Sequence, residues 1–407
     1  MLLVRFFCLL GCLLVAAGNV RADDSLRVFE RRILPIMNSM NASSCAECHL
    51  SGVDLKDYIR PSQSETFAAL RNGGLIDLDH PEKSKLLEFI ARAPEKPGLI
   101  KPEVRKAELD AFTAWITAAV ADPALLAAKT DQTIGSALPA EVIRHARQDR
   151  VLQLFIDNIW LESGRCAGCH SPDQNSEQVK EHGEQISWIV PHDPAGTLRV
   201  LRENELIDID APEKSLLIAK PTMQVNHGGG QKMVIGDRSY LQFMAFLTDY
   251  AASSKGAYQK VEDLPTPSPY LTAATDAWLK ITDIPEKYGT QVLRAEVYPA
   301  DGAGWAKSPI VVGDRSIAGE RKLWQQHLSL SLDRGSEQAG KMAAASQSER
   351  RIPGGKYLLK IWIATPEDFA ANRVTENGIA FETTLSTQWP GGYGNMTTVV
   401  FPLSSEK

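Results

Sequence analysis

Hydrophobic residues recur with a helical period in four stretches of the first part of the chain. In each stretch they are spaced three or four positions apart, which places them on one face of a helix. Two of the stretches precede a pair of cysteines, and two follow further along, so the pattern predicts two similar helical parts. The stretches are Leu26, Phe29, Ile33 and Ile36; Leu109, Phe112 and Ile116; Val151, Phe155 and Ile159; and Tyr240, Phe243 and Leu247.

The period changes in the C-terminal third, where short β-branched and aromatic runs are bounded by Gly, Pro, Asn and Asp. Several short strands with such turns predict an all-β sandwich, immunoglobulin-like or of the jelly-roll type. Residues 335–351 are mainly Ser, Ala, Gln and charged, and we expect a long loop there. The predicted fold class is two mainly α domains followed by an all-β sandwich. The predicted strands are 290–298, 308–312, 356–364, 378–385 and 397–402.

The two helical parts share an internal repeat. Residues 71–87 align without gaps on residues 202–218, and ten of the seventeen positions are identical. The same offset carries the stripe of the first closing helix onto that of the second. Agreement at one fixed offset indicates a duplication, so we expect both parts to have the same fold.

Four of the six cysteines form two copies of the motif C-x-x-C-H. Two thiols at this spacing can each add to a vinyl group of haem, while the adjacent histidine binds the iron. The motifs therefore predict two covalently bound haem c groups. They consist of Cys45, Cys48 and His49, and of Cys166, Cys169 and His170.

Three other interpretations of the cysteines remain open. A thioredoxin-like redox pair needs a βαβ context and a lowered thiol pKa, whereas the surroundings here are predicted to be helical. A zinc site would require both pairs to meet across more of the chain than structural zinc sites usually span. A disulfide within each motif closes too small a ring to stabilise the fold appreciably.

The sequence around the motifs resembles a class I cytochrome c domain, present twice. The P-E-K-S-x-L segment, followed by Lys220-Pro221 and by His227 with three glycines, is similar to the planctomycete-type cytochrome c family. The resemblance covers roughly residues 25–252. It implies small helical haem-c modules, often attached to other domains.

His49 and His170 are the expected proximal ligands, and the distal ligands differ between the two copies. In the second copy the candidates are His227, Met223 and Met233, of which we favour His227 because glycines follow it. In the first copy the positions of Met223, His227 and Met233 hold Arg, Lys and Pro. His80 is the conventional candidate there, with Met37, Met40 and Lys96 as remoter ones, and if none of them reaches the iron the first haem would be five-coordinate.

Residues 1–22 predict a secretory signal peptide with a short basic start, an apolar run at 6–17 and a small-x-small cleavage site. A lipobox ending at Cys12 is the alternative. We expect an exported, periplasmic chain with no transmembrane segment once the signal is removed. The expected parts are 1–22 signal peptide, 23–125 and 140–252 cytochrome c-like domains, 253–269 linker and 270–407 β-sandwich.

These observations predict an exported di-haem c-type cytochrome that mediates one-electron transfer between redox partner proteins. An electron carrier is favoured over a catalytic oxidoreductase. The alternatives are a peroxidase-like di-haem oxidoreductase with an open first haem, and a haem-based sensor. The net charge of −6 offers no broad cationic surface to nucleic acid.

The predicted sandwich shows no catalytic constellation. Its single histidine, His327, has no G-x-S-x-G partner. Trp362, Trp389 and Tyr393 are candidates to line a site for a carbohydrate or protein ligand, although a tryptophan in a strand usually belongs to the core.

Overall fold

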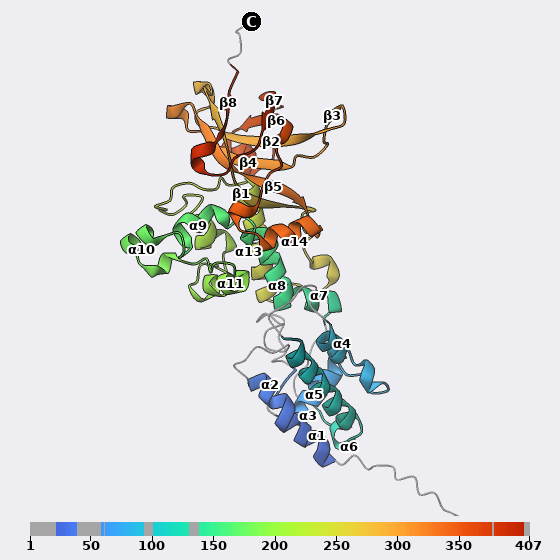
Figure 1. The fold of residues 1–407 in the computed structure, drawn as a ribbon. Helices are drawn as coiled ribbons and strands as arrows, with labels where there is room; N and C mark the ends of the chain where they lie inside the picture. The colour runs from blue at the N-terminus through green and yellow to red at the C-terminus, as the bar shows by residue number, and fades with distance from the viewer. Residues whose placement is uncertain are drawn as a thin grey trace, which may run out of the picture. The chain divides into compact units, whose positions relative to one another are not determined.

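The structure, a computed structural model, describes residues 22–38, 58–60, 62–92, 101–129, 138–376 and 378–402. The described residues form two compact units, one up to residue 129 and the other from residue 138 onward (Figure 1). The predicted signal peptide lies outside the described residues, apart from its last position.

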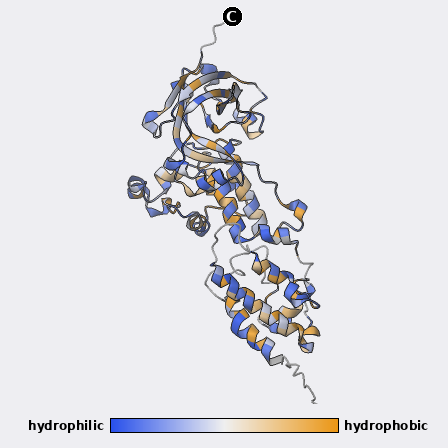
Figure 2. Cartoon of the chain, turned by 45° about the vertical axis from the view of Figure 1, so that its right-hand side comes forward, coloured by the Kyte–Doolittle hydropathy of each residue, from blue (hydrophilic) through white to orange (hydrophobic). Residues whose placement is uncertain are grey.

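The first unit is helical, and its core surrounds Trp115. The rings of Phe29, Phe67 and Phe112 lie 5.5–6.3 Å from the Trp115 ring, and all four side chains are fully buried. Each helix carries hydrophobic and hydrophilic positions, as expected where one face is buried (Figure 2). The elements are α1 (Ala22–Val28), η1 (Phe29–Ile33), α2 (Leu34–Asn38), α3 (Gln63–Asn72), η3 (Pro81–Lys83), α4 (Lys85–Ala91), α5 (Pro102–Val120) and α6 (Pro123–Leu126).

The second unit begins with a helical part whose core is formed by the predicted stripes. Val151, Phe155 and Ile159 of the opening helix pack with Phe243 and Leu247 of the closing helix in one buried cluster. The elements are α7 (Ala140–His145), α8 (Gln148–Phe155), η4 (Ile156–Trp160), α9 (Gly164–His170), α10 (Ser176–His182), η5 (Glu184–Ile186), α11 (Pro194–Glu203), η6 (Pro212–Lys214), α12 (Leu216–Ala219), α13 (Arg238–Ser254) and η7 (Val261–Asp263).

The rest of the second unit is one mixed sheet of eight strands. The strand order is β7-β6-β2-β4-β5-β1-β8, with β3 paired to β2; β1 and β8 are parallel, and the other pairs are antiparallel. The strands are β1 (Tyr270–Thr282), β2 (Val292–Asp301), β3 (Gly304–Trp305), β4 (Val311–Ser316), β5 (Trp324–Asp333), β6 (Gly355–Ala364), β7 (Phe381–Thr387) and β8 (Thr397–Val400).

The two edge strands of this sheet approach each other, so the sheet is almost closed into a barrel. The hydroxyl of Thr387 at the end of β7 lies 3.0 Å from that of Thr397 in β8. The ring of Phe381 in β7 packs 5.2 Å from that of Phe401, which follows β8. Side-chain contacts therefore connect the two edges.

The predicted fold class is wrong, because the strands form a single curved sheet rather than the two sheets of a sandwich. The prediction missed β1 and β5, whose pairing joins β8 to the strands that it did identify. The helical elements from residue 138 onward also share one compact unit with the sheet, instead of preceding it as a separate layer. Residues 335–351, predicted as a loop, contain α14 (Glu337–Ala344) and η10 (Gln347–Glu349).

Arg350 joins the second helical part to the sheet. Its buried guanidinium donates from Nη1 to the carbonyl oxygens of Leu161, at 2.5 Å, and Ala274, at 3.2 Å. The amide of Ala274 in β1 donates to the same Leu161 carbonyl, and the indole of Trp160 donates to the carbonyl oxygen of Ala343. Burial lowers the pKa of Arg350 to about 10, which leaves it charged at neutral pH.

The internal repeat is confirmed by its hydrogen bonds. In the first copy the hydroxyl of Ser84 accepts from the amide of Asp77 at 3.1 Å, and in the second copy Ser215 accepts from Asp208 at 2.9 Å. In both copies the aspartate oxygen accepts from the amides two and three residues further on. These amide donors lower the pKa of Asp77 and Asp208. The sequence identity therefore preserves one specific turn.

The opening helices of the two copies share a second feature. Each contains a π-helical turn, at Phe29–Ile33 in the first copy and at Ile156–Trp160 in the second. In each copy the π turn includes a buried residue of the predicted stripe, Ile33 or Ile159. The two copies thus agree in helix geometry as well as in sequence.

Replacing Ser215 with alanine should lower the free energy of unfolding by about 1–3 kcal/mol, because the amide of Asp208 loses its acceptor beside a buried side chain. Urea denaturation followed by tryptophan fluorescence measures this change. Ser176→Ala, at an exposed position at the start of α10, is the control and should be neutral. Equal stability of the two variants would show that the turn does not depend on the serine hydroxyl.

Candidate functional site

The second C-x-x-C-H motif lies on α9, while Cys45, Cys48 and His49 of the first motif lie outside the described residues. Arg165 fixes α9 in place. Its guanidinium donates to the carbonyl oxygen of Lys232 at 2.6 Å and to the hydroxyl of Ser239. It also pairs with Glu162 at 3.6 Å. The motif is thereby attached to the segment before α13 and to α13 itself.

Cys166 and Cys169 both carry free thiols. At a spacing of three on a helix they lie on the same face. Cys166 packs against the hydrophobic cluster of the helical part, and burial raises the pKa of its thiol to about 11. A redox-active dithiol needs the opposite shift, since the thiolate is the reactive form. The environment thus favours a structural or covalently modified cysteine over a thioredoxin-like one.

His170 is held in one tautomer. Its Nδ1 lies 2.7 Å from the carbonyl oxygen of Ile186, and because a carbonyl can only accept, Nδ1 carries the proton. Burial lowers the pKa of His170, which favours the neutral ring. The free lone pair is consequently on Nε2. This is the form of imidazole that binds a metal, with its other nitrogen oriented by a backbone carbonyl.

His227 repeats this arrangement on the segment between α12 and α13. Its Nδ1 lies 2.8 Å from the carbonyl oxygen of Gly230, so its Nε2 also carries the free lone pair. Gly230 has a φ of 67°, and a Cβ on Gly229 would lie 3.2 Å from the His227 ring. The glycines therefore permit the turn that orients this imidazole.

The two imidazoles are parallel, at a centroid spacing that two ligands of one metal ion would also have. The ring centroids of His170 and His227 are 6.2 Å apart, and the ring planes differ by 6°. Two imidazoles on opposite sides of one metal ion have centroids about 6 Å apart, because each nitrogen lies about 2 Å from the metal and about 1 Å from its ring centre. These residues thus fit the axial ligands of a haem iron.

Trp188 completes the surroundings of the proximal histidine. Its ring lies 5.5 Å from that of His170, and its side chain is buried. In the sequence, Trp188-Ile189-Val190-Pro191 matches Tyr58-Ile59-Arg60-Pro61 of the first copy, so both copies carry an aromatic residue at this position. The sequence could not predict that the carbonyl groups of Ile186 and Gly230 accept from the two histidines, because every residue has a backbone carbonyl whatever its side chain.

The other distal candidates lie elsewhere. Met223 has a φ of 63° and is exposed, whereas Met233 is 2% exposed and packs in the hydrophobic cluster. His80 precedes η3 in the first unit, and its exposed ring lies 3.6 Å from the carboxylate of Glu82. Within the described residues, which include His170 but not His49, only His227 of these candidates is placed beside the proximal histidine.

The aromatic candidates of the sheet divide into core and surface. Trp362 and Trp389 are buried, so neither can stack on a ligand at the surface. Tyr393 is 61% exposed and packs edge-on against Trp278, whose ring also contacts His327. His327 is buried, and burial together with the charges of Arg165, Arg315 and Lys232 lowers its pKa well below the usual value.

The described residues lack both a cluster of metal-ligating side chains and a membrane-spanning helix. No group of three or more His, Cys, Asp or Glu side chains is placed to hold a metal ion there. No helix in the same parts of the chain combines the length and the apolar character needed to cross a bilayer.

The chain was also compared with known proteins. No protein-family model, no curated protein and no solved structure matches it.

Proposed function

We propose that this protein is an exported di-haem c-type cytochrome that transfers single electrons between partner proteins. The observation that carries the proposal is the His170–His227 pair, with parallel rings 6.2 Å apart and both Nδ1 atoms bonded to backbone carbonyls. It occurs beside a C-x-x-C-H motif whose thiols are free. Two thiols and two imidazoles could also form a Cys2His2 zinc site, but within the described residues no group of three or more His, Cys, Asp or Glu side chains is placed to hold a metal ion directly.

In this proposal each residue of the second site has a distinct role. Cys166 and Cys169 attach the haem through thioether bonds, and His170 and His227 bind its iron. The carbonyl groups of Ile186 and Gly230 keep the ligand nitrogens deprotonated and aimed. A bound haem supplies an iron that gains and loses one electron. Two imidazole ligands hold its potential below that of a Met/His pair.

The first motif should attach a second haem in the same way. The repeat gives both copies the same turn and the same helical stripes, so a haem module in one copy supports a haem module in the other. Two haems in one chain can pass electrons from a donor protein to an acceptor protein. The polypeptide then sets the potentials by burial and ligation, while the iron carries the electron.

Expression in a host that matures c-type cytochromes should give a red protein carrying two haems per chain. The intact mass should exceed that of the processed chain by two haem groups, and Cys166→Ala together with Cys169→Ala should remove one of them. Ser171→Ala, beside the motif, should keep both haems. A colourless protein with four unmodified thiols would refute the proposal.

A second candidate function is suggested by the difference between the copies. His80, the predicted distal ligand of the first haem, is exposed beside Glu82, and alanine occupies the matching position of the second copy. A first haem without a distal ligand could bind a small molecule, as in a peroxidase-like oxidoreductase. A carbon monoxide difference spectrum of the reduced protein tests this: no response favours electron transfer alone, and a response from one haem favours the oxidoreductase.

A further inference from the structure

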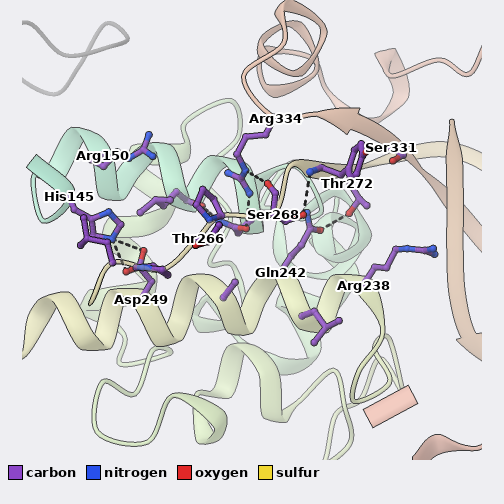
Figure 3. A pocket seen from close by; sticks show the side chains of 18 of the residues that line it. His145, Arg150, Arg238, Gln242, Asp249, Thr266, Ser268, Thr272, Ser331 and Arg334 are labelled. Atoms are coloured by element: carbon purple, nitrogen blue, oxygen red, sulfur yellow. Dashed lines mark hydrogen bonds and ion pairs between the residues drawn. The ribbon is translucent and has the colours of Figure 1, made fainter. Parts of the chain in front are cut away.

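A cavity of about 770 Å³ lies in the second unit between helices α8 and α13, the segment 261–270 and the sheet (Figure 3). Ligand sites of drug-sized molecules occupy roughly 300–1,000 Å³ and often form where two structural layers meet. Exposed Leu241, Val261 and Tyr270 are among its lining residues, so solvent can reach it. The size and the access are those of a binding site.

The cavity uses a face of α13 that the helical core leaves free. Phe243, Phe246 and Leu247 point into the hydrophobic cluster of the helical part. Gln242 and Ala245 line the cavity instead, and Ala245 is exposed. One helix therefore separates the candidate haem site from the cavity, and substitutions on the cavity face need not disturb the haem core.

Charged groups of both signs line the cavity. At one end His145 lies 2.7 Å from the carboxylate of Asp249 (Figure 3), and at the other end Arg238 pairs with Glu296. Arg334, on the side of the sheet, pairs with Asp157 at 2.6 Å. Glu141, Arg144 and Arg150 line the cavity as well. Because cationic and anionic groups both face the interior, this environment favours an uncharged ligand over an anion or a cation.

Between these ends the lining combines aliphatic walls with neutral polar groups. The segment after α13 contributes Pro265 and Pro267, which lack an amide donor and stiffen the wall. Thr266, Ser308 and Ser331 also line the cavity, and within the described residues their side chains make no hydrogen bond. Their free hydroxyls can bond to hydroxyl or carbonyl oxygens of a ligand.

We propose that this cavity binds an uncharged small molecule with an apolar ring or chain and one or two hydroxyl or carbonyl oxygens. The apolar body contacts the proline and aliphatic walls, and the oxygens bond to the Thr266, Ser308 and Ser331 hydroxyls. The site is independent of the haem proposal, because its lining includes neither motif histidine.

Calorimetric titration of the full haem-loaded chain with 2-naphthol and with 2-naphthalenesulfonate tests the proposal, since the two probes share a ring and differ in charge. We expect one 2-naphthol per chain, with the sulfonate bound at least about tenfold more weakly. Ala245→Trp places an indole on the cavity face of α13 and should weaken 2-naphthol binding at least about tenfold. Thr248→Trp, at an exposed position of α13 outside the cavity, is the matched control and should bind normally.

Three results would overturn the proposal: no binding of 2-naphthol, equal or tighter binding of the sulfonate, or unchanged 2-naphthol binding by Ala245→Trp. Should Ala245→Trp fail to fold, as judged by its circular dichroism, Leu241→Trp replaces it, since Leu241 is exposed and lines the same cavity. The two haems can be counted in the same samples. Failure of one proposal is therefore distinguishable from failure of the other.

Discussion

His227→Ala in the haem-loaded protein is expected to convert the second haem from a six-coordinate, low-spin state to a five-coordinate, high-spin state. The reason is that His227 is the only distal candidate placed beside His170, with its Nε2 lone pair free. The visible spectrum of the oxidised protein should gain a high-spin component, and the reduced protein should bind carbon monoxide at this haem. His227→Met should stay low-spin but raise the potential by about 0.1 V or more, within the roughly 0.8 V range that axial ligands span.

Two methionine variants serve as controls for this result. Met223→Ala should leave the spectrum unchanged because Met223 is exposed. Met233→Leu conserves the volume of a buried side chain, and should cost less than about 1.5 kcal/mol of stability without altering the spin state. A low-spin His227→Ala protein combined with a high-spin Met233→Leu protein would identify Met233 as the ligand and remove the observation on which the proposed function rests.

Asp314→Asn is expected to destabilise the second unit by about 3–5 kcal/mol, because it leaves the buried charge of Arg294 without its main partner. In the native protein the Asp314 carboxylate lies 2.9 Å from Nε of Arg294 and accepts from the backbone amide of Arg238 at 3.1 Å. Both members of the Arg294–Asp314 pair are buried. Urea denaturation followed by circular dichroism measures the loss.

The controls separate the ion pair from a general effect of losing a carboxylate. Asp301→Asn, at the exposed end of β2, should be neutral. Replacing both partners, Arg294→Met with Asp314→Leu, should restore much of the stability, because a buried pair exchanged for apolar residues often costs little. A double variant as unstable as Asp314→Asn would mean that the loss comes from packing and not from an unpaired charge.

The same carboxylate makes stability depend on pH. Burial raises the pKa of Asp314, whereas the charges of Arg294 and Arg238 lower it. Together the lowering effects outweigh burial, so the pKa of Asp314 lies below the ordinary 3.8. A lowered native pKa contributes stability above the unfolded value, and this contribution is lost as pH falls through the native value. The native protein should therefore lose stability below about pH 4, and Asp314→Asn should lose less of it over that range.

The helical core was predictable because its signal is local. The spacing of Phe155 and Ile159 and that of Phe243 and Leu247 identified residues that are buried together. Leu26 was predicted on the same kind of stripe but is exposed. A stripe shows which face is apolar, and only the neighbouring elements decide how much of that face is covered.

The sheet was not predictable in the same way, since a sandwich and a curved single sheet use similar local patterns. β5 alternates clearly through Leu328 and Leu330, but β1 contains Asp276 and Lys280 among its apolar residues. The pairing of these two strands decides the architecture, and it joins residues more than forty positions apart, such as Leu271 and Leu332. Long-range pairing of this kind leaves no trace in a short window of sequence.

For the candidate site the residue types were predictable but the geometry was not. C-x-x-C-H identified Cys166, Cys169 and His170, and the following glycines favoured His227 over the two methionines. What distinguishes His227 in the structure is a backbone acceptor, the carbonyl oxygen of Gly230, which fixes its tautomer. The first motif lies outside the described residues, so its prediction remains as the sequence made it.

The π-helical turns of the two copies change the direction of the side chains along the opening helices. One extra residue in a helical turn rotates all later side chains by about 100° relative to a regular α-helix. The offset of the repeat carries Phe29 onto Trp160, so the turns Phe29–Ile33 and Ile156–Trp160 overlap at one aligned position only. In each copy the apolar stripe before the turn and the stripe after it therefore do not continue along one straight α-helical line.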